Sequence, residues 1–119
     1  MDTDLLSEKF GRMGARVKVG AVGFSRRRPG LDIGSDERGE FFDIRLNPAE
    51  QVEYEVVDLR PDLRHLLLLA RREGAKEKYL CGHDERHWFV CAVPGQSVST
   101  VTNALEALQP VEVRRAERR

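Results

Sequence analysis

The chain has 119 residues, the length of one domain that can bury its own hydrophobic core. Its 20 basic residues balance its 20 acidic ones, so the net charge predicts no particular polyanionic or polycationic partner. With 40% hydrophobic and 34% charged residues, the composition excludes a disordered chain.

Residues 1–14 are predicted to form a short N-terminal helix or lid, because Leu5, Leu6 and Phe10 follow the spacing of one or two helical turns. Residues 15–93 then alternate between apolar and polar positions, which is typical of strands with one buried face. Turn signals separate the predicted strands, which are Ala15–Val22, Leu31–Ile33, Phe41–Leu46, Val52–Val57, His65–Arg71 and the two arms of a hairpin.

This hairpin, Lys78–Val93, is the stretch around which the predicted fold is organised. It holds both cysteines, two of the three histidines and the only tryptophan. Its arms, Tyr79–Gly82 and His87–Val93, are rich in aromatic and β-branched residues, and the polar run from His83 to Arg86 forms the turn. Apolar side chains occupy both faces of the second arm, so we expect a central strand that is covered on both sides.

One amphipathic helix is predicted near the C-terminus, over Val98–Gln109. Ser97 is placed to cap its N-terminus, and Pro110 stops it. Its apolar stripe, at positions i, i+3, i+7 and i+10, consists of Val98, Val101, Leu105 and Leu108. We expect Leu105 to be buried against the sheet. Residues 111–119 form a charged tail.

Together these elements predict an α+β fold in a single domain, residues 1–119. The six to seven strands of residues 15–93 would form an antiparallel β-meander that curls into a small barrel or sandwich to hide its edges. The helix at residues 98–109 would cap it. Seven strands followed by a capping helix is an order that resembles the layout of pleckstrin-homology-like barrels. The tryptophan usual in the C-terminal helix of that family is absent here, and the resemblance implies only the layout.

Four residues of the hairpin are of types that bind zinc: Cys81, His83, His87 and Cys91. Their spacing argues against one site that uses all four. With an even number of loop residues, the two cysteines face opposite sides of the sheet. With an odd number, all four residues share a face, but Cys91 lies about 13 Å along the strand from the other three. At most Cys81, His83 and His87 could converge. We therefore expect no metal and no cofactor, but two reduced core thiols.

A thiol enzyme is a related alternative, with Cys81 as nucleophile and His83 or His87 as its base. However, a cysteine in the middle of a sheet lacks the helix N-terminus or open cleft that activates such nucleophiles. The sequence also contains no glycine-rich phosphate loop of the G-x-x-x-x-G-K or G-x-G-x-x-G kind. We therefore expect no catalytic residues.

The best candidate for binding is an arginine-rich loop at residues 23–30, with the sequence GFSRRRPG. Three consecutive arginines offer donors suited to phosphate or carboxylate, and two basic residues on the preceding strand would extend the patch. The candidate binding residues are Arg16, Lys18, Arg26, Arg27 and Arg28. In the alternative interpretation, the loop is merely solvated and paired with nearby acidic residues. No RNP-type aromatic pattern or helix-turn-helix accompanies these charges.

The sequence thus predicts a non-catalytic binding or assembly module that recognises a protein or an anionic partner through its loops or a sheet edge. A protein partner or self-association is expected first, and an anionic ligand or nucleic acid could bind through Arg26–Arg28. No apolar run reaches the roughly 18–20 residues of a membrane span, and residues 1–9 lack the apolar core of a signal peptide, so we expect a cytoplasmic protein. The alternative function is a small metal- or thiol-dependent enzyme, or a metal-stabilised domain, that uses Cys81, His83 and His87.

Overall fold

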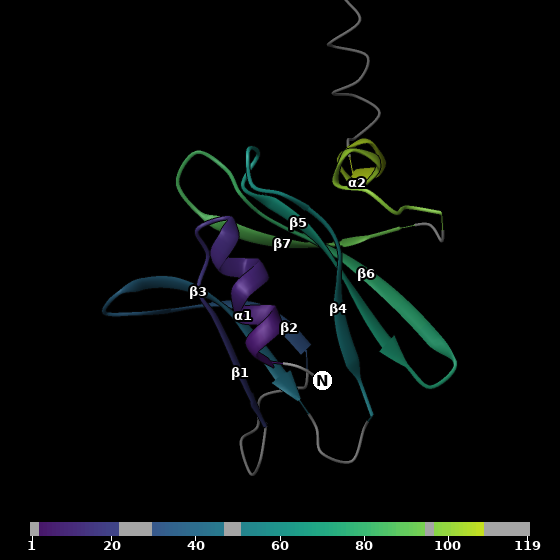
Figure 1. Ribbon diagram of the computed structural model, residues 1–119, viewed down its shortest axis with the longest axis horizontal. Coiled ribbons are helices and arrows are strands. Elements are labelled where there is room, and N and C mark those ends of the chain that lie inside the picture. Colours follow the sequence, from purple (N-terminus) through teal and green to yellow (C-terminus); the bar gives the residue numbers. More distant parts are fainter. Residues whose placement is uncertain (1–2, 22–29, 47–50, 95–96, 109–119) are drawn as a thin grey trace, which may run out of the picture.

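The computed structural model describes residues 3–21, 30–46, 51–94 and 97–108. Within them the chain forms two helices and seven strands (Figure 1). In chain order these are α1 (Thr3–Arg12), β1 (Val17–Ala21), β2 (Gly30–Asp36), β3 (Gly39–Leu46), β4 (Glu53–Arg60), β5 (His65–Arg72), β6 (Ala75–His83), β7 (Trp88–Val93) and α2 (Val101–Leu108). The broad α+β class is therefore confirmed, with strands as the main element.

The first three strands form a mixed sheet in the order β1-β3-β2. β2 and β3 make a tight antiparallel hairpin, whereas β1 runs parallel to β3 along its other edge. The prediction of one antiparallel meander over residues 15–93 was therefore wrong. Pairing with β3 places Val17 opposite Phe42 and Val19 opposite Ile44, and these apolar cross-strand pairs stabilise the sheet.

The other four strands do form an antiparallel meander, in the order β4-β5-β6-β7. Its centre is the leucine run of β5, which is buried on both faces as its length predicted. Leu66 and Leu68 lie in the core between the sheets, and Leu67 lies in a second cluster on the outer face. β4 bulges where its register with β5 shifts between Val56 and Asp58.

The two sheets share one core, and α1 packs into it (Figure 1). The rings of Phe10 in α1 and Phe42 in β3 lie 5.0 Å apart, and both side chains are fully buried. α1 contacts β1 and β4, while β7 lies beside β2. In the described part of the chain no strand pairing joins the two sheets, so the barrel is not closed. The order of seven strands followed by a helix, on which the pleckstrin-homology-like resemblance was based, is observed, but the antiparallel meander is not, because β1 runs parallel to β3.

α2 covers part of the outer face of the four-stranded sheet. Val101 and Ala104 are fully buried there, packed with Leu67 and Leu80. Leu105 was expected to be buried, but it is only partly buried at the edge of this cluster.

α2 begins at Val101, three residues later than predicted. Thr100, not Ser97, is its N-cap: the Thr100 hydroxyl accepts a hydrogen bond of 3.0 Å from the Asn103 N–H. Val98 precedes the helix and is buried as part of the segment that leads into it.

β7 lies at the edge of its sheet and is not the predicted central strand. Its two apolar faces nevertheless both have partners. Trp88 and Val90 pack in the core between the sheets, whereas Phe89 and Val93 pack in the cluster under α2. An edge strand can also be covered on both faces, here because α2 packs over the outer face of the sheet. Near the start of β7, the Trp88 N–H donates a hydrogen bond of 3.1 Å to the Glu40 carboxylate.

Candidate binding groove

The arginine loop predicted as the main binding element, Arg26–Arg28, lies outside the described residues, as does the charged tail at 111–119. Arg16 and Lys18 are described, and both bind the carboxylate of Asp36. The Arg16 Nη1–Asp36 Oδ1 and Lys18 Nζ–Asp36 Oδ2 distances are each 3.0 Å. The hydrogen bonds from Arg16 and then Lys18 hold the pKa of Asp36 far below its usual range. These two cations are thus already paired with a carboxylate of their own sheet.

The same two cations lie over the ring of Phe41. Lys18 Nζ is 4.2 Å and Arg16 Cζ is 5.6 Å from the ring centroid, within the range of cation–π contacts. The ring itself lies over Gly34, where a Cβ atom would come within 2.6 Å of the Phe41 Cζ atom. The contacts among Arg16, Lys18, Asp36 and Phe41 therefore favour a structural role for these residues.

The two cysteines face opposite sides of the sheet, as expected for an even hairpin loop. Cys81 is fully buried in the core between the sheets, opposite Val90, and Cys91 is opposite Leu80. Both thiols are free. Burial raises the pKa of the Cys81 thiol, which disfavours the thiolate that a nucleophile or a zinc ligand requires.

The histidines of the hairpin have separate surroundings. The His83 ring packs edge-on against Trp88, with ring centroids 4.9 Å apart. His87 is exposed, and its Nδ1 lies 3.4 Å from the Glu40 carboxylate. Among the residues that the structure describes, no group of three or more histidine, cysteine, aspartate or glutamate side chains is arranged to hold a metal ion. Cys81, His83 and His87 therefore do not converge.

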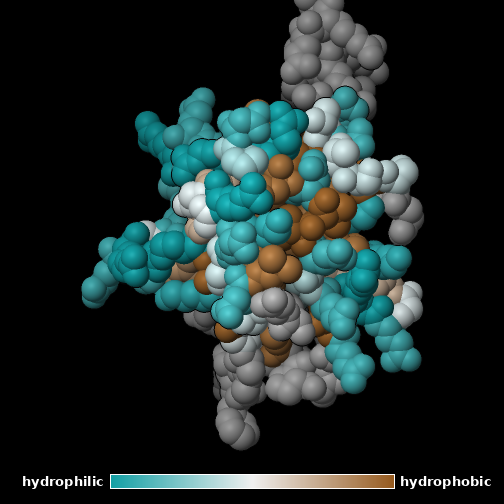
Figure 2. Space-filling model, viewed as in Figure 1, coloured by the Kyte–Doolittle hydropathy of each residue, from teal (hydrophilic) through white to brown (hydrophobic). Residues whose placement is uncertain are grey.

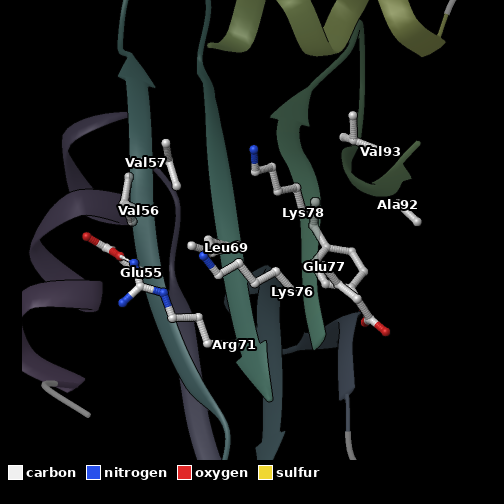
Figure 3. Close-up of a pocket in the computed structure, with 11 residues that line it drawn as sticks. Glu55, Val56, Val57, Leu69, Arg71, Lys76, Glu77, Lys78, Ala92 and Val93 are labelled. Atoms are coloured by element: carbon white, nitrogen blue, oxygen red, sulfur yellow. Dashed lines mark hydrogen bonds and ion pairs between the residues drawn. The ribbon is translucent and has the colours of Figure 1, made fainter. Parts of the chain in front are cut away.

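An open groove lies on the outer face of the four-stranded sheet, beside α2 (Figure 3). Its volume is about 540 Å³, which falls within the usual range of ligand sites. β4, β5 and β6 run beneath it and α2 lies at one end (Figure 3). In Figure 2, apolar surface extends below α2 and is surrounded by hydrophilic side chains. The lining residues are Glu55, Val56, Val57, Leu69, Arg71, Lys76, Glu77, Lys78, Tyr79, Ala92 and Val93.

Three basic side chains line the groove on two neighbouring strands. Arg71 of β5 and Lys76 of β6 are direct cross-strand partners, and Lys78 is opposite Leu69 on the same face. Directly opposed side chains have Cβ atoms about 5 Å apart, and like charges at this distance destabilise a sheet. Glu55 offsets one of the three charges, because its Oε2 lies 3.0 Å from an Arg71 guanidinium nitrogen. Glu53, on β4, is the direct cross-strand partner of Arg71 on its other side, so acidic residues of β4 and basic residues of β5 and β6 share this face.

Glu77, the other acidic residue of the lining, extends away from these cations (Figure 3). Its carboxylate accepts a hydrogen bond of 2.5 Å from the Tyr79 hydroxyl. Partial burial is the main cause that raises the pKa of Tyr79 to about 12, and the hydrogen bond to Glu77 is the second. Apolar side chains lie among the charges: Leu69 is 6% exposed and Val57, at the bulge, is 38% exposed.

α2 is held beside the groove by two polar contacts from the sheet. The Asp58 carboxylate, at the bulge of β4, accepts a hydrogen bond of 2.8 Å from the Val101 N–H at the start of the helix. Lys78 Nζ donates a hydrogen bond to the Val98 carbonyl. Lys78 therefore both lines the groove and anchors the segment that leads into α2.

A second hollow, of about 550 Å³, lies at the turn between β5 and β6. Its lining residues are Arg71, Arg72, Gly74, Ala75 and Lys76. The two hollows share Arg71 and Lys76, so the basic residues of this one hairpin gather at one end of the sheet.

Sequence reasoning did not find this groove. The turn at Glu73–Gly74 and the acidic residues around it separate the basic residues of β5 from those of β6. The sequence therefore shows no continuous basic run here, unlike at Arg26–Arg28. The available signal is the alternation Lys76-Glu77-Lys78 after a tight glycine turn. Such alternation places both lysines on one face of a strand.

In the described part of the chain, neither helix has the length and apolar character needed to cross a membrane. Comparisons of the chain with protein families, curated proteins and solved structures find no match. What the protein does must therefore be inferred from the groove and its charges.

Proposed function

We propose that this protein is a non-catalytic binding module and that the groove recognises a negatively charged partner. The observation that carries the proposal is the like-charge pair Arg71–Lys76 in the lining of the groove. Opposed like charges destabilise a sheet by up to about 1 kcal/mol. An anionic partner would remove this repulsion.

The groove also suits a partner that carries apolar groups. Leu69 forms part of its floor, and the half-exposed Val57 borders it. Binding sites commonly combine such apolar surface with a few charged groups that fix the orientation of the ligand.

A binding role fits the lining residues better than catalysis does. None of the described residues that line the groove is a serine, cysteine or histidine. Its two carboxylates are engaged, Glu55 with Arg71 and Glu77 with Tyr79. Catalysis would require a nucleophile and a base within reach of each other.

We propose a protein as the first partner, in the cytoplasm. The arginine loop at Arg26–Arg28 is a second proposed contact for anionic partners, since guanidinium groups bind carboxylate and phosphate through paired hydrogen bonds.

Calorimetric titration with poly-glutamate at two salt concentrations tests the proposal. The wild type should bind, and more weakly at the higher salt concentration. The double variant Arg71→Gln/Lys76→Gln should bind about fivefold more weakly or worse, because two exposed ion pairs are lost. The matched control, Arg12→Gln/Arg38→Gln, removes the same charge outside the groove and should bind as the wild type does. Equal binding by all three proteins would show that the groove is not the site.

A further inference from the structure

We infer that Arg64 and His83, gathered around Trp88, form a binding site for a phosphate group. This inference goes beyond the proposed function, because the site lies at the other end of β5 and β6 from Arg71 and Lys76.

The strand register brings these three residues together. His83 ends β6 and pairs with Trp88 at the start of β7. On the other side of β6, the His83 N–H donates a hydrogen bond of 3.1 Å to the Arg64 carbonyl. Arg64 belongs to the turn between β4 and β5, which lies beside the β6–β7 loop at this end of the sheet (Figure 1). The three residues thus come from neighbouring segments of the meander.

The Trp88 ring holds both of the other side chains in place. The Arg64 guanidinium carbon lies over this ring, 4.7 Å from its centroid, which is a cation–π contact. The His83 ring packs edge-on against the same indole. Side chains that are already confined lose less conformational entropy when they bind a shared ligand.

The backbone of Arg64 is a second reason to assign it a role. Its φ is 56°, in the left-handed region that glycine adopts most easily. Among the described residues it is the only one other than glycine with a positive φ. Residues held in such conformations cluster at binding sites and active sites. The Arg64 side chain therefore points to a function that glycine would not serve.

Both side chains keep donors that are open to a ligand. Arg64 is exposed, and its Nε donates a long hydrogen bond of 3.5 Å to the Met13 carbonyl. In the described part of the chain, no carboxylate forms an ion pair with Arg64, and neither ring nitrogen of His83 has a hydrogen-bond partner. The outer edge of the guanidinium and one imidazole N–H are thus available.

Nearby carboxylates have other partners. Asp62 pairs with Arg60 in the same turn. The Asp84 carboxylate accepts hydrogen bonds from two backbone N–H groups of its own loop. Glu40 accepts one from the Trp88 N–H. These contacts leave the guanidinium over the indole without a counter-ion of its own.

A phosphate group suits these donors better than a carboxylate does. The outer edge of a guanidinium donates two parallel hydrogen bonds to two oxygens of an anion. A carboxylate has only those two oxygens, whereas a phosphate has a third that can accept the hydrogen bond from His83.

Trp88 is the only tryptophan, so the intrinsic fluorescence of the protein reports on this site directly. Titration with sodium phosphate at constant ionic strength should change the fluorescence and reach saturation. Sodium acetate, titrated in the same way, should bind about threefold more weakly or worse, because it lacks the contact with His83. A blocked phosphoserine peptide, in a third titration, distinguishes a phosphorylated protein from the free ion as the source of the phosphate group, since the true source should bind more tightly.

Arg64→Asn removes the guanidinium and preserves the turn, because asparagine tolerates the left-handed conformation. This variant should bind phosphate about tenfold more weakly or worse. The matched control, Arg38→Asn, removes an arginine from the turn between β2 and β3 and should bind phosphate as the wild type does. His83→Phe keeps an aromatic ring beside Trp88 and should abolish the preference for phosphate over acetate.

A fluorescence response that does not saturate would overturn the inference, and so would equal binding of phosphate and acetate by the wild type. Equal losses in Arg64→Asn and Arg38→Asn would overturn it as well. Poly-glutamate should bind Arg64→Asn as it binds the wild type, because the groove lies at the other end of the strands. Failure of the phosphate site therefore leaves the proposed function standing.

Discussion

At the residue scale, two glycines make room for aromatic rings of neighbouring strands. Gly82 of β6 lies under the His65 ring, and Gly34 of β2 lies under the Phe41 ring. A Cβ atom at Gly82 would come within 2.9 Å of three ring atoms of His65. That ring is held edge-on against Phe89, with centroids 5.4 Å apart. Close approach, not an unusual backbone angle, therefore requires glycine at position 82.

Replacing Gly82 with alanine should destabilise the fold by about 1–3 kcal/mol, because the His65 ring must move. Its Nδ1 atom lies 2.6 Å from the Leu63 carbonyl, which restrains that movement. Urea denaturation followed by tryptophan fluorescence measures the change. Gly20→Ala on β1 is the control, since a Cβ atom there meets no atom within 4 Å. Equal stability of the two variants would contradict this account of Gly82.

Asp36 should contribute to the dependence of stability on pH. Its pKa in the folded protein is lowered by Arg16 and then by Lys18. The stability that it contributes is therefore fully present above its unfolded pKa of about 3.9, and is lost as the pH falls from there through the folded pKa. An Asp36→Asn variant should lose less stability than the wild type between pH 5 and pH 2. Parallel loss in both proteins would show that the Arg16–Asp36–Lys18 contact is not maintained in solution.

At the element scale, local pattern predicts where strands lie, but not which strands pair. Alternation, residue type and turn signals together located the seven strands, and the length of the leucine run identified β5 as buried on both faces. Pairing of β1 with β3 depends on contacts between residues far apart in sequence, such as Val17 and Phe42. Likewise, α2 begins at Val101 because Thr100 and the distant Asp58 carboxylate both bind its first turn. No local signal near Ser97 reveals the contact from Asp58.

Replacing Asp58 with alanine should lower the free energy of unfolding by about 0.5–2 kcal/mol, which is typical of the loss of a helix cap. Asp58→Asn keeps an oxygen acceptor and should lower the free energy of unfolding by a smaller amount. Amide hydrogen exchange should accelerate in α2 before it accelerates in β5. Unchanged exchange in α2 would show that the Asp58–Val101 contact does not hold the helix.

Burial within α2 gives a second prediction for this element. Val101→Ala should cost about 1–3 kcal/mol, because Val101 is fully buried over Leu67 and Leu80. Leu105→Ala should cost less, although leucine is the larger side chain, because Leu105 is only partly buried. Thermal or urea unfolding measures both. A larger loss for Leu105→Ala would mean that α2 packs through a different face.

At the scale of the whole molecule, a net charge of zero does not show where the charged side chains lie. Arg71 and Lys76 oppose each other on a sheet face that Glu53 and Glu55 share, whereas Arg16 and Lys18 of the other sheet are paired with Asp36. Composition cannot predict this arrangement, because the strand register creates it. The binding module predicted from the sequence stays a prediction, and the groove could not be found without the pairing of Arg71 with Lys76.

The central claim is that this groove, and not the three-stranded sheet, receives an anionic partner. Mapping of backbone amide chemical shifts by NMR, during titration with poly-glutamate, tests it most directly. The account predicts that the largest changes fall between Leu69 and Lys78 and at the end of β7 near Val93, and that Lys76→Gln reduces them. Largest changes on β1–β3, or confined to Arg26–Arg28, would contradict it.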